Sequence, residues 1–122
     1  MEKCPFCHID REIILSNELS FAMYDKYPVS GGHTLVIPKN HVADYFDLTA
    51  SEKHSLWELV DQVKSLIQEM HQPDGFNVGF NVNRTAGQTV FHVHIHVIPR
   101  YEGDVDDPTG GVRGVIPERR VY

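Results

Sequence analysis

Three histidines alternate with apolar residues in the stretch FHVHIHVIPR, at positions His92, His94 and His96. Residues two apart in an extended strand point to the same side, so these imidazoles share one face. The first and third Cα atoms are roughly 13 Å apart in such a strand, which is too far for all three rings to bind one metal ion. The spacing instead predicts an extended polar surface that suits a polyphosphate. Imidazoles titrate near neutrality, donate to phosphate oxygens, and act as nucleophiles or as acids and bases.

Polar residues just upstream of this stretch favour the same interpretation. They are Asn81, Gln88 and Thr89. The alternative is that all three are ordinary surface histidines on a half-exposed strand, which is the simplest interpretation of a single histidine there. Strict alternation of three histidines beside amide and hydroxyl groups argues against it.

The two cysteines of the chain, Cys4 and Cys7, form a C-x2-C pair. In a reducing compartment such a pair indicates metal binding or redox chemistry rather than a structural disulfide. It can supply half of a tetrahedral zinc site, with two further ligands from distant residues. A thioredoxin-like role is disfavoured, because the pair does not open a helix after a strand. The alternative is a pair of reduced, partly buried thiols.

The elements that must position these groups are predicted from the pattern of apolar residues. Residues 19–24 and 33–37 have the composition of short strands, and the segment 26–32 between them is a loop rich in Pro and Gly. Thr49 and Glu52 have the spacing of a helix capping box. An apolar stripe at three- and four-residue steps follows and predicts one long helix; it consists of Leu56, Leu59, Val60, Val63, Leu66, Ile67 and Met70.

The stretch 76–83 alternates apolar and polar residues, as a half-buried strand does. A short turn separates it from the histidine stretch, so the two predict antiparallel neighbours. The expected fold class is α+β: an antiparallel sheet with one long helix packed on its apolar face. The opposite, polar face is then open for chemistry.

Length and charge set the remaining limits. A chain of 122 residues suits one domain, residues 1–122, with a core over 1–100 and an irregular tail over 101–122 that is rich in Gly, Asp and Pro. The formal net charge of −6 argues against broad binding to DNA or RNA. No stretch is apolar enough to span a membrane, and the N-terminal residues have no apolar core of a signal peptide, so a cytoplasmic protein is expected.

The stretch GQTVFHVHIHVIPR resembles the signature of the histidine triad superfamily, and GGHTLVIPK, from Gly31 to Lys39, resembles a second landmark of that family. The resemblance extends from about Cys4 to Arg100. The tail, with GDV from Gly103 and GGVR from Gly110, is similar to the branch related to fragile histidine triad proteins. The resemblance implies the antiparallel fold described above, and a hydrolase or transferase acting on the α-phosphate of nucleotidyl compounds.

The resemblance also implies roles for individual residues. His94, the middle histidine, would be the nucleophile that forms a nucleotidyl-histidine intermediate, with His96 at the scissile phosphate or leaving group. His33 matches a fourth family histidine in the phosphate site. Gln88 and Thr89 would hold phosphate oxygens, Asp25 the ribose, and Asn81 a polar position near the phosphate.

In many prokaryotic relatives the C-x2-C pair belongs to a structural zinc site. The ligands implied here are Cys4, Cys7, His41 and His92, with His8 as a reserve ligand, and no organic cofactor is expected. Family members are usually homodimers, so a homodimer is expected too. The competing functional hypotheses are an adenosine phosphoramidase, a nucleotide-binding module with little turnover, and a zinc-dependent structural or interaction protein.

Overall fold

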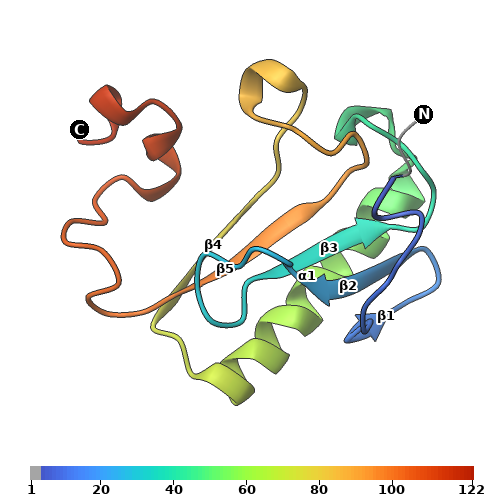
Figure 1. Ribbon diagram of the computed structural model, residues 1–122, viewed down its shortest axis with the longest axis horizontal. Coiled ribbons are helices and arrows are strands. Elements are labelled where there is room, and N and C mark those ends of the chain that lie inside the picture. The colour runs from blue at the N-terminus through green and yellow to red at the C-terminus, as the bar shows by residue number, and fades with distance from the viewer. Residues whose placement is uncertain (1–3) are drawn as a thin grey trace.

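A computed structural model describes residues 4–122 of the chain. Its centre is a five-stranded sheet in the order β1-β2-β3-β5-β4, in which all neighbours are antiparallel. The strands are β1 (Leu15–Ser16), β2 (Ser20–Tyr24), β3 (Thr34–Pro38), β4 (Gly75–Gly79) and β5 (Ile95–Arg100). One long helix, α1 (Ala50–His71), lies across one face of this sheet (Figure 1). The predicted α+β fold with one helix on an antiparallel sheet is therefore confirmed.

Helix α1 begins at the predicted capping box. The Thr49 hydroxyl accepts from the Glu52 amide at 3.1 Å, and the Glu52 carboxylate accepts from the Thr49 amide at 3.0 Å. These two bonds satisfy backbone donors that the first helical turn leaves without partners. The helix ends at His71, because the next residue, Gln72, has a left-handed backbone, and Pro73 follows.

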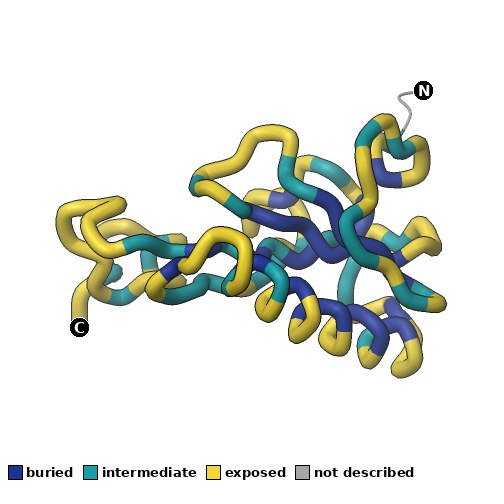
Figure 2. Tube along the Cα trace, turned by 90° about the horizontal axis from the view of Figure 1, so that it is seen from below, coloured by how far each residue is buried: buried dark blue, intermediate teal, exposed yellow. Residues whose placement is uncertain are grey.

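The main core lies between α1 and the sheet. Figure 2 shows the buried positions of the helix turned toward the sheet and its exposed positions turned away. Six of the seven residues in the predicted stripe are buried or half-buried, but Met70 is 59% exposed near the end of the helix. From the sheet, this core contains Ala22, Val36, Ile95 and Val97.

A second apolar cluster covers part of the opposite face. Phe21 and Met23 from β2 and Leu35 and Ile37 from β3 pack there against Phe6 of the N-terminal segment. Strands β2 and β3 are thus apolar on both faces, so the predicted polar face is restricted to the end of the sheet near β5. His96 is directly opposite Leu35 on the neighbouring strand, and the two side chains share this face.

Two predicted strands have different bounds in the structure. The stretch predicted over 76–83 forms a strand only to Gly79, and the histidine stretch joins the sheet only at Ile95. His92 and His94 precede β5, because this part of the chain is held by other contacts. The Val93 amide donates to the Val42 carbonyl at 2.8 Å, and the imidazole of His92, rather than a strand amide, bonds the Pro38 carbonyl at 2.8 Å.

The remaining segments contain short 3-10 turns: η1 (Tyr45–Asp47), η2 (Arg84–Ala86), η3 (Gly111–Val115) and η4 (Pro117–Arg119). The last two belong to the tail, which extends away from the sheet at the C-terminal end of β5 (Figure 1). Within residues 4–122, no helix combines the length and the apolar character needed to cross a membrane.

Candidate active site and metal centre

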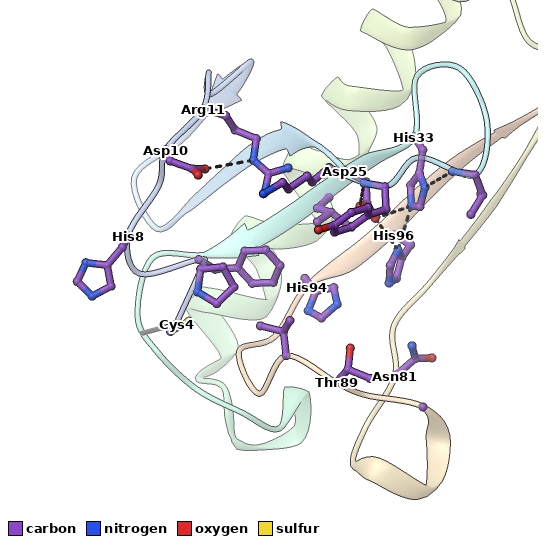
Figure 3. A pocket seen from close by; sticks show the side chains of 18 residues that line it. Cys4, His8, Asp10, Arg11, Asp25, His33, Asn81, Thr89, His94 and His96 are labelled. Atoms are coloured by element: carbon purple, nitrogen blue, oxygen red, sulfur yellow. Dashed lines mark hydrogen bonds and ion pairs between the residues drawn. The ribbon is translucent and has the colours of Figure 1, made fainter. Parts of the chain in front are cut away.

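A cavity of about 720 Å³ opens beside the end of β5. His94 and His96 line it together with His33, which directly precedes β3 (Figure 3). Its outer wall is the N-terminal segment, including Phe6 and Arg11. The three histidines that the resemblance implies in the phosphate site thus meet in one cavity. His92, implied as a metal ligand, does not line it.

His94 presents an unprotonated nitrogen to this cavity. Its Nδ1 lies 2.8 Å from the backbone carbonyl of His92. A carbonyl oxygen only accepts, so Nδ1 carries the hydrogen and Nε2 of the neutral ring keeps its lone pair. Burial lowers the pKa of His94, against smaller opposing effects of the His92 carbonyl and Asp25. The side chain is therefore neutral at physiological pH and available as a nucleophile.

A chain of hydrogen bonds fixes the protons of His33 and His96. The Val29 amide donates to His33 Nδ1 at 3.1 Å, so the hydrogen of the neutral ring is on Nε2. His33 Nε2 then donates to His96 Nδ1, 3.0 Å away. His96 must accept at Nδ1, and its own hydrogen is on Nε2. The ring of His96 therefore offers one N–H donor beyond this chain.

Burial also keeps both of these rings neutral. Burial and, to a smaller extent, the neighbouring His94 and His33 together lower the pKa of His96 to about 4, against the opposing effect of Asp25. Burial lowers the pKa of His33 as well, although the Asp25 carboxylate opposes that shift. The neutral His96 ring carries no charge but still has one N–H group. It can therefore donate a hydrogen bond to a phosphate oxygen at neutral pH.

Asp25 follows β2 and faces the same two rings. Its Oδ1 accepts from the Tyr27 amide at 2.8 Å, while Oδ2 lies 3.4 Å from His33 Nε2 and 4.0 Å from His96 Nδ1. The carboxylate lines the cavity and can accept hydrogen bonds from hydroxyl groups of a bound molecule. This is the chemistry required at a ribose.

The four residues of the predicted metal site converge at a second place. The ligand atoms of Cys4, Cys7, His41 and His92 all lie within 4.8 Å of one another. His92 Nδ1 is 3.3 Å from Cys4 Sγ, 3.5 Å from Cys7 Sγ and 3.1 Å from His41 Nδ1. Donor atoms around a tetrahedral zinc ion are about 3.3–3.8 Å apart, given bonds of 2.0–2.3 Å. The set therefore fits a zinc ion in both geometry and donor type.

The hydrogen bonds of His92 support the same assignment. Its Nε2 donates to the Pro38 carbonyl at 2.8 Å, which leaves the lone pair of Nδ1 directed at the two sulfurs. A metal-bound histidine commonly donates its other ring hydrogen to a carbonyl in this way. His8, the reserve ligand, is exposed, lines the cavity and is outside this cluster.

Asp25, His33 and His96 also place three ligand-type atoms within 4.8 Å of one another. Their protons argue against a metal ion between them. His33 Nδ1 is already an acceptor, so the Nε2 that faces Asp25 and His96 carries a hydrogen and has no free lone pair. This cluster is a hydrogen-bond relay, unlike the cysteine-containing one.

The predicted phosphate-contacting residues divide into two groups. Asn81 and Thr89 line the cavity opposite His94 and His96 (Figure 3). Gln88 is only 4% exposed and does not line it. Its amide nitrogen donates to the carbonyls of Ala43 and Val90 at 2.8 and 3.3 Å, and its oxygen accepts from the Asn83 amide at 2.7 Å. The Gln88 side chain is thus bonded inside the loop that carries Thr89, and its contact with phosphate stays a prediction.

Several groups of the cavity were not predicted from the sequence. Arg11 and Lys26 line it and bring positive charge into an acidic protein. The backbone amide of Val29 and the carbonyls of Pro38 and His92 fix the ring protons. Backbone groups have no sequence signature, so they become visible only in three dimensions.

The sequence profile described as the HIT domain matches residues 7–103. The chain is a member of the HIT family. Solved structures of the family have the same fold. A Zn-bound histidine triad family protein from Mycobacterium smegmatis superimposes with a TM-score of 0.74 at 36% identity, over 83% of this chain and 77% of that one.

Characterised relatives of this HIT protein include enzymes. It is 42% identical over 103 residues to a bis(5'-adenosyl)-triphosphatase of Dictyostelium discoideum, a match that covers 84% of this chain and 69% of the relative. It is 35% identical to an AP-4-A phosphorylase of Mycobacterium tuberculosis, over 87% of this chain and 55% of that longer protein.

Proposed function

We propose that this HIT protein hydrolyses nucleotidyl substrates at the α-phosphate through a covalent intermediate on His94, and that dinucleoside polyphosphates are its preferred class. The observation that carries this proposal is the hydrogen bond from His94 Nδ1 to the His92 carbonyl at 2.8 Å. It leaves Nε2 as a neutral nucleophile in the cavity that holds the other candidate residues.

The reaction has two displacements at one phosphorus atom. His94 Nε2 attacks the α-phosphorus, a P–N bond forms, and the P–O bond to the leaving nucleotide breaks. Water then attacks the same phosphorus, the P–N bond breaks, and the mononucleotide leaves with the hydroxyl group from water. The proton from that water goes to the solvent or to the departing phosphate. Two in-line displacements return the phosphorus to its original configuration.

The neighbouring side chains would stabilise negative charge on the transferred group. The His96 Nε2–H and the hydroxyl of Thr89 are donors within the cavity, and Asn81 offers an amide. Asp25 would accept from the ribose hydroxyls. Positioned neutral donors of this kind stabilise a developing oxyanion without any reorganisation during the step.

Cations at the cavity, Lys26 above all, favour a polyphosphate over an amine as the leaving group. Lys26 and Arg11 line the cavity together with Asp10 and Asp25, and Arg11 is paired with Asp10 at 3.7 Å. A nucleotide leaving group carries negative charge that such cations attract, whereas the amine of a phosphoramidate does not. The two relatives named for adenosine polyphosphate substrates support the same class.

We also propose that Cys4, Cys7, His41 and His92 hold a structural zinc ion. Two cysteine sulfurs and two imidazole nitrogens converge with spacings that fit tetrahedral zinc. Bound there, zinc would supply a cross-link between the N-terminal segment, His41 and the segment before β5. The four ligands complete the shell and leave no open position for chemistry.

A homodimer is proposed from an exposed aromatic surface beside the edge strand β4. Tyr45 stacks on Phe80 with ring centroids 4.2 Å apart, Trp57 donates to the Tyr45 hydroxyl, and Phe46, 66% exposed, lies against both rings. Exposed aromatic groups of this kind are characteristic of protein interfaces. Sedimentation of the wild type and of Phe46→Asp tests it: the variant should be monomeric, and an unchanged mass would exclude this surface.

The experiment that tests the proposed function compares diadenosine triphosphate with an adenosine phosphoramidate as substrates. We expect preferred turnover of the former and its loss in His94→Ala by at least about a thousandfold. His54→Ala is the matched control, because His54 is an exposed helical histidine far from the cavity, and it should retain full activity.

The other outcomes identify the competing hypotheses. Preference for the phosphoramidate would make the protein a phosphoramidase. Tight binding of AMP, with the same slow background in wild type and His94→Ala, would mean a binding module. No effect of nucleotide at all, together with loss of partner binding on metal removal, would mean a zinc-dependent interaction protein.

A further inference from the structure

The loop from Tyr27 to Gly32 is tied to the strand that carries His96. The Ser30 hydroxyl donates to the Pro99 carbonyl in β5 at 2.7 Å. The Tyr101 hydroxyl, one residue past the end of β5, donates to the Gly31 carbonyl at 2.6 Å. Both bonds join residues 69 or 70 positions apart in the sequence, so they fix the loop relative to β5 rather than within itself.

The other side of the same loop is held against α1. Gly32 has a left-handed backbone with φ of 94°, and a Cβ atom there would lie only 3.1 Å from the His71 ring and 3.2 Å from Ile67. The loop is therefore packed between the C-terminal end of α1 and the end of β5. Its position has little freedom as long as the two hydroxyl contacts are intact.

The functional consequence lies at Val29, in the middle of this loop. Its amide donates to His33 Nδ1 at 3.1 Å, so the hydrogen of the neutral His33 ring must be on Nε2. The protonated Nε2 of His33 in turn requires His96 to accept at Nδ1. A loop displaced by a few tenths of an ångström would weaken the first bond and release both rings.

We propose that Tyr101 is a positioning residue that holds the Val29 amide against His33 and thereby sets the ring protons of His33 and His96. This inference deepens the proposed function, on which it rests for its catalytic consequence. In the alternative arrangement His33 carries hydrogen on Nδ1 and accepts at Nε2, so His96 donates from Nδ1. A lone pair of His96 would then face the phosphate in place of an N–H, and a donor to the transition state would be lost.

Three other side chains lie near the two rings, and only the charged one, Asp25, bears on the same choice. Asp25 contacts His33 and His96 from the end of β2, His94 lies beside His96, and Leu35 is apolar. The Asp25 carboxylate lies closer to His33 Nε2, at 3.4 Å, than to His96 Nδ1, at 4.0 Å, so it also favours hydrogen on His33 Nε2. The Val29 amide is the group whose position depends on the Tyr101 hydroxyl, through the loop.

The test compares Tyr101→Phe with Ser30→Ala and with Tyr122→Phe in the metal-loaded protein. Tyr122 is a matched control, because its side chain is 92% exposed in the tail. Two quantities are measured: the kinetic constants with diadenosine triphosphate, and the 15N signals of the imidazoles in the free protein, which distinguish a protonated ring nitrogen from an unprotonated one.

We expect Tyr101→Phe to lower kcat by about threefold to tenfold, the effect of losing one hydrogen bond, with KM changed by less than about twofold. Its His33 and His96 signals should show a mixture of the two ring forms. Ser30→Ala should act in the same direction and Tyr122→Phe should match the wild type.

Unchanged 15N signals in Tyr101→Phe would overturn the proposal, even if kcat falls. Loss of activity to the same extent in Tyr122→Phe would also overturn it. The NMR comparison needs no turnover, so it stands if the wild type does not hydrolyse the substrate. A shifted ring form with an inactive wild type would leave the positioning role of Tyr101 intact and contradict only the proposed function.

Discussion

The histidines of this protein differ in role because different ring nitrogens are engaged. His92 donates from Nε2 to the Pro38 carbonyl and directs Nδ1 at two sulfurs. His94 donates from Nδ1 and keeps Nε2 free. His33 accepts at Nδ1 from a backbone amide and donates onward to His96. The sequence identified these residues as a group, but one ring nitrogen of His33, His92 and His94 is bonded to a backbone atom, and only the fold determines which one.

Lys26 provides a test of the leaving-group preference. The Lys26→Gln variant loses one of the two cations at the cavity, and we expect kcat/KM for diadenosine tetraphosphate to fall by about twofold to fivefold. The value for an adenosine phosphoramidate should hardly change. Lys64→Gln, on the exposed side of α1, is the control. Equal losses for both substrates would exclude a role in recognising the leaving group.

At the scale of elements, the segment 4–11 and the segment before β5 are positioned without strand pairing. Their contacts converge at the cysteine and histidine cluster, and Phe6 lies between the two cysteines. The Phe6 ring is 5.0 Å from the His94 ring and 5.8 Å from the His92 ring. A metal ion in the cluster would therefore hold one wall of the nucleotide cavity as well as the chain around His92.

Removing a ligand should show this connection. Cys7→Ser is expected to lose zinc, measured by atomic emission, and to melt at least about 5 °C lower than the wild type. AMP affinity should fall with it, because the wall formed by the N-terminal segment loses its anchor. His8→Ala should keep its zinc, since His8 lies outside the cluster. Full zinc content in Cys7→Ser would contradict the assigned ligand set.

The capping box makes a simpler prediction. Thr49→Ala removes the hydroxyl that accepts from the Glu52 amide and should lower the free energy of unfolding by about 1 kcal/mol. Urea denaturation measures this, with the exposed neighbour Ser51→Ala as a control that should cost less. Activity should be unchanged, because the N-terminus of α1 does not line the cavity.

Local patterns predicted the elements better than their ends. The helix, its capping box and the antiparallel pairing of β4 with β5 follow from periodicity and turn residues, and the structure has all three. The histidine strand begins later than predicted, because Val93 bonds Val42 and His92 bonds Pro38, contacts between residues far apart in the chain. Gln88 was assigned to phosphate by resemblance, but its partners in the loop are backbone groups with no signature in sequence.

For the whole molecule, the buried histidines connect the site to stability. Burial lowers the pKa of His33, His92, His94 and His96, and that of His96 falls to about 4. In the unfolded chain a histidine titrates near 6.5. Between these values the unfolded state binds more protons than the folded state, so the free energy of unfolding decreases as the pH falls from about 6.5 toward 4. Above this range the stabilisation is complete.

The variant His96→Asn isolates one part of this effect. The wild type should lose free energy of unfolding between pH 7 and pH 4.5. The loss in His96→Asn should be smaller by on the order of 2 kcal/mol. Urea denaturation at the two pH values measures the difference. Acid also weakens any bound metal, but it does so equally in both proteins, so the comparison cancels that contribution. If stability depends on pH identically in the two proteins, burial does not lower the pKa of His96.

The covalent bond that we propose between His94 and phosphorus can be tested by trapping the intermediate. Wild-type protein is mixed with diadenosine triphosphate, quenched within milliseconds in alkaline denaturant, which preserves P–N bonds, and analysed by intact-mass and peptide mass spectrometry. We expect a mass increase of one adenylyl group, located on His94 and absent from His94→Ala. Turnover by the wild type without any adenylylated peptide, or with the group on another residue, would contradict it.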